Sequence, residues 1–459
     1  MATTYLTRTP SSGAATQKAT FSFWVKKTNT TGTPNLFRMY TNAQQYVRIR
    51  FESSNKISFI IINSDSYVVQ LISTQVFRDT SAWYNIVCNM DTTQATASDR
   101  AKIYINGERI TAYDTATYPP TQNANIIVTP SGTANHIGTQ LGDSPSYFEG
   151  CMSHVNFTDG YVYQASEFGE TDSTTGEWKI KTSPSVTYGT NGFFILKDGN
   201  SVTDQSGNSN NFTVAGGTLT NTEDCPDNVF ATWNSLNYNL TAITLSNGNT
   251  KMNGTNNASY PNAITSLGIP KSGKWYAEFK QAGTQGFVLG IGDMPTFIDA
   301  LRTDTTATIF TTGGSGVAIF RSAGDVIISG SDFNNVTPAF SSNDIAMIAY
   351  DPANGAIYFG RNGTWGSVGG VVGDPTSGAS RTGAINISAQ SWFTTSQEQG
   401  FLVGVASNGQ YAIIEANFGN GTFGTTAVTS AGTNASGNGI FEYDVPTGYT
   451  ALSTKGLNL

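Results

Sequence analysis

The sequence contains few residues that could carry out covalent chemistry, and the best group is a set of three carboxylates. Glu167, Glu170 and Asp172 lie together in the run EFGETDSTTGEW. Glycoside hydrolysis needs two carboxylates that face each other across the scissile bond. Gly169 and the Thr/Ser run predict a loop rather than a strand that could present them on one face. We therefore interpret the three residues as a solvated acidic turn.

Histidine and cysteine are scarce, which limits nucleophilic and redox chemistry. The chain has two histidines and three cysteines: His136, His154, Cys88, Cys151 and Cys225. No C-x-x-C or nucleophile-elbow motif accompanies them, and an odd number of distant cysteines does not suggest a disulfide framework. Cys88 alternates with apolar residues and is expected in the core, and His154 is expected to be half-buried and hydrogen-bonded on a strand. We predict no catalytic residues and no enzyme activity.

Oxygen ligands of the kind that Ca²⁺ prefers are concentrated in one polar segment. The candidates are Asp198, Asn200, Asp204, Gln205, Ser206, Asn208 and Asn210. The segment lacks the Asp-x-Asp-x-Asp-Gly order of a calcium loop, and Asx-turns in a polar connection account for its composition without a metal. We expect no metal site and no cofactor, with Ca²⁺ as the alternative at this segment.

Aromatic side chains in expected loops are the remaining candidates for a binding site. A flat ring can stack on a sugar face while neighbouring Asn and Asp side chains bond the sugar hydroxyls. The candidates for carbohydrate contact are Tyr147, Tyr161, Tyr163, Trp178, Trp365 and Trp392. Surface aromatics also serve subunit interfaces, so that role stays open for each of them. The other tryptophans are expected to pack in the interior, at Trp24, Trp83, Trp233 and Trp275.

Composition excludes several classes of protein. The 459 residues carry a formal net charge of -8 and only 12% charged residues, so we expect no nucleic-acid partner. Aromatic residues make up 12%, a share that disordered chains do not carry. Apolar runs such as Phe59 to Ile62 are far too short for a membrane span, and no apolar signal-peptide core begins the chain. We expect no membrane insertion.

Alternation of apolar and other residues with period two dominates the first half and predicts strands. It runs through residues 21–25 and 47–51, where Arg48 and Arg50 form the expected solvent-exposed face. Asn106-Gly107 follows the alternating residues Ile103 and Ile105 and predicts a tight hairpin turn.

The second half shows the same alternation, with little sign of helix. It runs through residues 275–279, 287–291 and 411–416, and Asn362-Gly363 predicts another hairpin. One or two helical turns are expected near Phe297–Leu301. The fold class is therefore all-β, with two antiparallel jelly-roll sandwiches joined by an ordered polar bridge. The expected domain limits are 1–197 and 261–459, with residues 198–260 as an irregular bridge.

The first half resembles the laminin-G-like, concanavalin A-like lectin/glucanase sandwich. The matching elements are FSFWVKKT (Phe21–Thr28), SAWYNIVCNMD (Ser81–Asp91), KIYINGERI (Lys102–Ile110), HIGTQ (His136–Gln140) and YFEGCMSHVNFTDGY (Tyr147–Tyr161). In the glucanases of this fold the carboxylates follow a Glu-x-Asp-x-x-Glu order on one strand, which residues 167–172 lack.

The second half is similar to SPRY-type domains, which are also concanavalin A-like sandwiches. The elements that carry this resemblance occur in the expected order: SGKWYAEFK (Ser272–Lys280), GFVLGIG (Gly286–Gly292) and AMIAYDPANGAIYFGRNGTW (Ala346–Trp365). In that family the tryptophan after the Asn-Gly turn, here Trp365, commonly packs on its own hairpin.

The combination resembles virion appendage proteins, such as tail fibres, of marine tailed bacteriophages and especially of cyanobacterial phages. Two long stretches carry the resemblance, Glu167–Gly217 and Ile413–Leu457. It implies a non-enzymatic virion structural protein, made in the host cytoplasm and exposed on the particle, that assembles with other virion proteins and with copies of itself. Host-surface polysaccharide is the expected ligand of its lectin-like domains.

Two other functions stay open from the sequence. One is a purely architectural capsid decoration or tail component that binds only other virion proteins. The other is a polysaccharide depolymerase, which the missing carboxylate pattern disfavours. Because no coiled coil, collagen-like stalk or β-helical shaft precedes the first sandwich, a short fibre, fibre tip or capsid-attached fibre is favoured over a shafted fibre.

Overall fold

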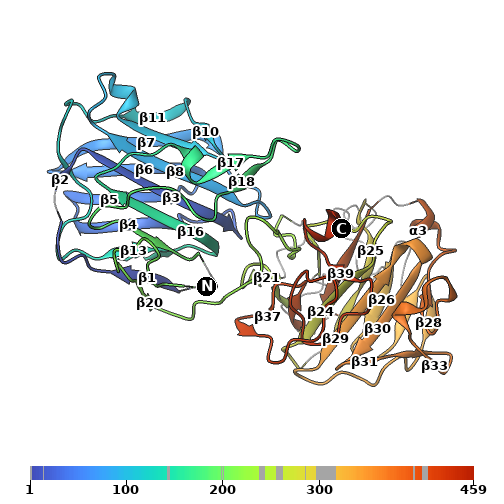
Figure 1. Ribbon diagram of the computed structural model, residues 1–459. Coiled ribbons are helices and arrows are strands. Elements are labelled where there is room, and N and C mark those ends of the chain that lie inside the picture. The colour runs from blue at the N-terminus through green and yellow to red at the C-terminus, as the bar shows by residue number, and fades with distance from the viewer. Residues whose placement is uncertain are drawn as a thin grey trace. The chain divides into compact units, whose positions relative to one another are not determined.

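The regular elements of the computed structural model are mostly strands, in two compact units of residues 1–221 and 222–459 (Figure 1). This confirms the all-β fold class. The structure describes residues 3–458 except 14, 142–144, 198, 200, 237–242, 255–261, 285, 296–316, 396–397 and 406–411. The helical turns expected near Phe297–Leu301 lie outside the described residues. Among those described, none of the helices has the length and apolar character of a membrane-crossing segment.

The first unit is built from two antiparallel sheets. The eight-stranded sheet has the order β11 (Tyr113–Thr117), β7 (Ser66–Val76), β6 (Lys56–Asn63), β5 (Gln45–Phe51), β4 (Asn35–Asn42), β13 (Asn135–Ile137), β1 (Tyr5–Arg8) and β20 (Thr213–Ala215). The six-stranded sheet has the order β10 (Glu108–Arg109), β9 (Ala101–Ile105), β8 (Tyr84–Asp91), β3 (Lys18–Lys27), β16 (Gly150–Asp159) and β19 (Phe193–Ile195). Period-two alternation gives each strand one face toward the partner sheet.

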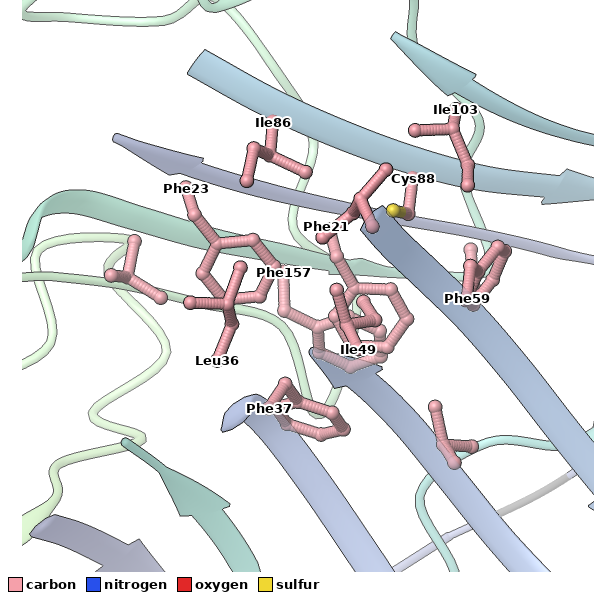
Figure 2. Close-up of a cluster of buried hydrophobic side chains, with 14 of the residues drawn as sticks. Phe21, Phe23, Leu36, Phe37, Ile49, Phe59, Ile86, Cys88, Ile103 and Phe157 are labelled. Atoms are coloured by element: carbon pink, nitrogen blue, oxygen red, sulfur yellow. The ribbon is translucent and has the colours of Figure 1, made fainter. Parts of the chain in front are cut away.

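The core of the first unit lies where the inner faces of these sheets meet (Figure 2). The Phe21 ring on β3 stacks on Phe157 of the neighbouring β16, with ring centroids 4.6 Å apart. It also contacts Phe37 of β4, in the opposite sheet, at 4.8 Å. Cys88 is fully buried in this cluster, as expected, and burial raises the pKa of its thiol. These contacts fix which face of every strand points outward.

Both hairpins predicted from Asn-Gly pairs are present. Asn106 and Gly107 have φ angles of 47° and 86°, and β9 and β10 pair on either side of them. Asn362 and Gly363 have φ angles of 49° and 80° between β30 (Ala356–Arg361) and β31 (Thr364–Trp365). Positive φ at both central positions matches the twist of the flanking strands, which explains the strength of this sequence signal.

The second unit is also built from two main sheets. The nine-stranded sheet contains β21 (Ile243–Ser246), β22 (Lys251–Gly254), β36 (Ala412–Asn417), β24 (Trp275–Gln281), β29 (Ile345–Asp351), β30 and β31, with β34 (Ile385–Asn386) beside β30 and β39 (Thr450–Ala451) beside β24. The six-stranded sheet contains β23 (Asn262–Ile264), β35 (Gln399–Val405), β25 (Phe287–Asp293), β26 (Val317–Arg321), β27 (Val326–Ile328) and β28 (Ser331–Phe333). Trp233, Trp275 and Phe279 belong to the core of this unit.

The segment 198–260, expected as an irregular bridge, is divided between the two units. In the first unit β20 pairs with β1, and Phe212 is buried in the core. In the second unit β21 pairs with β22, which in turn pairs with β36. Backbone hydrogen bonds form the ladders whatever the side chains are, so a segment rich in Asn, Ser and Gly can still add strands to a sheet. The boundary between the units at residues 221 and 222 therefore differs from the expected domain limits.

Candidate functional site

The outer face of the six-stranded sheet in the first unit is polar, yet it is buried. Its buried polar side chains are Thr20, Ser22, Asn85, Asn89, Asn156 and Thr158. Residues 161–188 bond directly to this face. The Tyr163 amide donates to Thr20 Oγ1 at 2.9 Å, Asn89 Nδ2 donates to the Tyr163 carbonyl at 2.9 Å, and Tyr188 donates to Asn156 Oδ1 at 2.8 Å. We call residues 161–188 the covering segment.

Two of the predicted sugar-contact residues, Tyr163 and Trp178, pack the covering segment against the sheet. They lie against a small apolar cluster that includes Val87 and Phe168. The Trp178 ring passes so close to Gly107 that a Cβ there would lie 2.6 Å from it, and its Nε1 donates to Asn85 Oδ1 at 3.1 Å. A ring held on one side by backbone and at its edge by a hydrogen bond is a structural anchor.

Most of the acidic run at residues 167–178 lies in a hairpin, whereas Glu167 ends a short 3-10 helix (Ala165–Glu167); both correct the loop expected there. Strands β17 (Gly169–Thr171) and β18 (Trp178–Ile180) pair, and Asp172 organises the turn between them. Its carboxylate accepts from the amides of Thr174 and Thr175 and from Lys179 Nζ, each at 2.8 Å. These donors, the Lys179 ammonium first, hold the pKa of Asp172 well below its usual range. A carboxylate this strongly committed is a poor proton donor.

The tryptophans predicted as loop residues in the second unit are also partly or fully enclosed. Trp392 lies on the short helix α3 (Ser391–Thr395) and is buried in the core, which corrects its expected place in a loop. Trp365 lies edge-on to Tyr276 and Tyr358, with centroid distances of 6.3 and 6.5 Å, so it packs on its own hairpin and the adjacent strand. The four tryptophans expected to pack inside, Trp24, Trp83, Trp233 and Trp275, are all buried.

The polar segment considered for Ca²⁺ is organised around Asp204. Its Oδ1 accepts from the amides of Phe194 and Ser206 at 2.8 and 2.9 Å, and its Oδ2 accepts from the Asn210 amide at 2.8 Å. Hydrogen-bond donors thus already surround both oxygens. Two other candidates, Asp198 and Asn200, lie outside the described residues, and no metal-ligand cluster occurs within the part of the chain that the structure describes. Ca²⁺ binding stays a hypothesis.

The outer face of the eight-stranded sheet is partly exposed and carries a different set of side chains. Arg38, Tyr40, Tyr46, Arg48 and Tyr67 share this face, opposite to the core, and we call them the arginine–tyrosine face. In the strand register Tyr40 lies opposite Tyr46. Ile62 lies opposite both Tyr46 and Tyr67, which completes a row across four strands. Tyr40 and Tyr67 are 41% and 47% exposed, so their rings are available to a ligand.

A row of basic side chains runs beside the tyrosines. Arg38 on β4 lies directly opposite Arg48 on β5, and His136 on β13 lies on the other side of Arg38. The Arg38 guanidinium lies 4.6 Å from the Tyr40 ring centroid and 5.0 Å from that of Tyr46, and the Arg48 guanidinium lies 5.6 Å from Tyr46. The tyrosine rings therefore hold both guanidinium groups on the same face.

The charges in this row are unevenly compensated. Arg50, the next outward residue on β5, forms a two-pronged ion pair with Glu52 at 3.0 and 2.7 Å. Among the described residues no carboxylate pairs with Arg38 or Arg48; Arg38 donates instead to the neutral Gln140 Oε1 at 3.1 Å. Burial, with a smaller contribution from Arg48, lowers the pKa of Arg38 to about 10. The side-chain Nε atoms of Arg38 and Arg48 are buried without a hydrogen-bond partner in the described part of the chain.

Of the two remaining tyrosines predicted to contact sugar, Tyr147 lies close to this basic row and Tyr161 lies apart from it. Tyr147 on β15 (Ser146–Tyr147) lies 6.4 Å from the Tyr5 ring, and Tyr5 contacts His136 edge-on at 5.7 Å. Burial, followed by the charge of Arg38, lowers the pKa of His136. Tyr161 is 42% exposed and begins the covering segment on the opposite sheet, so the structure does not bring it together with Tyr147.

The arginine–tyrosine face was not predicted, although the sequence carries a signal for part of it. Tyr46, Arg48 and Arg50 alternate with the core residues Val47 and Ile49, which places all three on one outer face. An arginine on a strand is ordinarily a solvated residue, and the sequence does not reveal that β4 places Arg38 and Tyr40 beside it. The cross-strand register supplies this information.

Comparisons with known proteins agree with a lectin-type sandwich in the first unit. A family model described as the Concanavalin A-like lectin/glucanases superfamily matches residues 2–166. No curated protein matches the chain. The first unit thus has a concanavalin A-like, laminin-G-like fold, whereas a bacteriophage origin stays a prediction.

Solved structures with low identity include laminin and SPRY domains. Domains LG4-5 of the mouse laminin alpha1 chain match with 8% identity and a TM-score of 0.29, covering 97% of this chain and 96% of that one. The SPRY domain of human HERC1 matches with 14% identity and a TM-score of 0.27, covering 38% of this chain and 91% of that one. A SAP-like pentraxin from Limulus polyphemus matches with 14% identity and a TM-score of 0.27, covering 35% of this chain and 71% of that one.

Proposed function

We propose that this chain is a non-enzymatic structural protein of a tailed-phage virion, a fibre, fibre tip or capsid-attached fibre, that recognises glycans on the host surface. The observation that carries the binding role is the row of tyrosines on the open sheet face of the first unit, two of them more than a third exposed. Exposed rings on a rigid sheet supply stacking surfaces for sugars at low entropic cost. The virion role rests on the sequence resemblance.

The placement of the acidic residues supports this proposal over a catalytic one. Of the three carboxylates nearest to a hydrolase pattern, Glu167 ends a short 3-10 helix, whereas Glu170 and Asp172 lie in a hairpin of the covering segment, where Asp172 accepts the hydrogen bonds of the turn. Weak single-site contacts become firm adhesion when many copies are displayed on one particle, which suits a homo-oligomeric appendage attached to other virion proteins.

The test is binding of the full chain to cyanobacterial cells before and after periodate treatment, which destroys sugar rings. We expect saturable binding that periodate abolishes, and a loss of about tenfold in affinity for the double variant Tyr40→Ala/Tyr67→Ala. Tyr161→Ala removes an equally exposed tyrosine elsewhere and is expected to bind normally. If the folded chain does not bind the cells, the result would instead support the purely architectural role, in which the chain binds only other virion proteins. Binding that survives periodate would show that the chain recognises something other than a glycan.

A further inference from the structure

The basic row on the open sheet face has a feature that neutral sugar binding does not require. Arg38 and Arg48 are direct cross-strand partners, and like charges in directly opposed positions destabilise a sheet. Arg38 is only 6% exposed, so its charge is also largely desolvated. The sheet therefore holds two positive charges together, and among the described residues neither has an ion-pair partner of its own; Glu52, which is paired with Arg50, only partly offsets the charge of Arg48.

The neighbouring Arg50, on the same strand, has an ion-pair partner and provides a comparison for Arg48. Glu52 compensates Arg50 with two hydrogen bonds, and Ser58 Oγ donates to the same carboxylate at 2.6 Å. Two residues earlier on the strand, Arg48 lacks this arrangement. The chain as a whole is acidic, with a formal net charge of -8. The adjacent positive charges of Arg38 and Arg48 are therefore opposite in sign to the net charge of the chain.

From this geometry we infer that the arginine–tyrosine face binds an acidic polysaccharide, whose carboxylate or sulfate group is held between Arg38 and Arg48 while its sugar rings lie on the tyrosines. Guanidinium groups bond planar or tetrahedral oxyanions through parallel N–H donors. The tyrosine row runs directly beside the arginine pair, so one chain of sugars can contact both. This inference rests on the proposed glycan-binding function and names the class of glycan.

The surroundings of the arginine pair supply further donors for an anion. His136 flanks Arg38 in the strand register, and its Nδ1 is buried without a partner among the described residues. An anion at the pair would favour the protonated ring, since opposite charge nearby raises the pKa of a histidine. The other titratable or charged groups that face the pair are Tyr40, Tyr46, Tyr67 and the compensated Arg50 with Glu52.

The experiment measures binding of the full chain to four immobilised polymers: polygalacturonate, dextran sulfate, neutral dextran and polyglutamate. We expect at least one acidic polysaccharide to bind, with neutral dextran and polyglutamate at least about tenfold weaker. The double variant Arg38→Gln/Arg48→Gln should lose at least about tenfold in affinity while its circular dichroism and urea midpoint show that it is folded. Comparing polygalacturonate with dextran sulfate tells whether the anion is a carboxylate or a sulfate.

The matched control is Arg50→Gln/Glu52→Gln, which removes a compensated pair from the same face without changing the net charge and should bind like the parent chain. Equal binding of dextran, or full binding by the arginine variant, would overturn the acidic-ligand inference and leave glycan binding intact. Equal binding of polyglutamate would show attraction to any polyanion and would also overturn it. If no polysaccharide binds and periodate-sensitive cell binding is absent as well, the proposed function itself fails.

Discussion

The two outer faces of the first unit handle polar side chains in opposite ways. On the six-stranded sheet, Asn85, Asn89 and Asn156 are buried, and each bonds to the covering segment. On the eight-stranded sheet, Arg38 and Arg48 lie beside exposed tyrosines and form no ion pair with any described residue. A buried polar group stabilises a fold only when its hydrogen bonds are made. The first face satisfies that rule within the chain, whereas on the second face the Nε atoms of Arg38 and Arg48 have no hydrogen-bond partner among the described residues.

This difference separates aromatic side chains that pack within the fold from aromatic side chains that remain exposed. The rings of Trp178 and Tyr163 pack against apolar side chains within the fold. Tyr40 and Tyr67 carry comparable rings and leave much of them in solvent. The sequence shows both sets as aromatics in polar surroundings, and only the packing distinguishes them.

The largest effect should come from breaking the covered face at its anchor. Trp178→Ala removes the ring that lies against Gly107 and its hydrogen bond to Asn85. We expect the free energy of unfolding to fall by about 3 kcal/mol, with faster amide exchange across residues 161–188 and unchanged glycan binding. Urea unfolding and peptide-level hydrogen exchange measure these effects, with Tyr161→Ala as an exposed control. Loss of glycan binding without loss of stability would return Trp178 to the list of sugar-contact residues.

The second unit also has a sheet face that is covered by a chain segment, and there the segment bonds to a buried carboxylate. Glu278 on β24 is fully buried, and its oxygens accept from the amides of Glu442 and Tyr443 at 2.8 and 2.9 Å and from the Tyr276 hydroxyl at 2.9 Å. These bonds hold residues 441–445 over an apolar patch that includes Tyr276. Burial raises the pKa of Glu278 to about 7 despite the amide donors.

An effect of intermediate size should follow from titrating Glu278. Its folded-state pKa lies above the ordinary 4.5, so its stabilising contribution is complete below about pH 4.5 and is lost as the pH rises through about 7. We expect the free energy of unfolding to fall by about 2 kcal/mol between pH 5 and 8 through this group. Glu278→Gln should abolish that slope, and the ion-paired Glu415→Gln should keep it. Parallel pH profiles for the parent chain and Glu278→Gln would contradict this role.

The sequence predicted most of the fold because its strand signals are local. Alternation over residues 21–25 and 47–51 and the two Asn-Gly turns depend only on neighbours in the chain, and the structure confirms them. The strands in 198–260 were missed because β20, β21 and β22 are held by ladders to distant strands rather than by an apolar pattern of their own. Tertiary pairing overrides weak local propensity.

The candidate site was harder to predict because it depends on register. Arg38 and Arg48 are ten residues apart with a turn between them, and a shift of one residue in the pairing would move one of them to the core face. The predicted residues Trp178 and Trp392 are enclosed because the segments around them fold back on a sheet or enter the core, which residue type alone does not show.

The smallest effect should distinguish the two faces most clearly. A substitution on the arginine–tyrosine face should leave the free energy of unfolding unchanged or raise it, whereas Trp178→Ala on the covered face lowers it. Arg48→Gln removes one of two opposed like charges, so we expect the free energy of unfolding to stay the same or rise by about 0.5 kcal/mol. Urea unfolding at low and high salt measures the change, and the gain should shrink as salt screens the repulsion. If Arg48 stabilised the sheet, its replacement by Gln would lower the free energy of unfolding. A clear loss of stability would mean that Arg48 serves the sheet itself, and the contrast between the two faces would then no longer identify a binding surface.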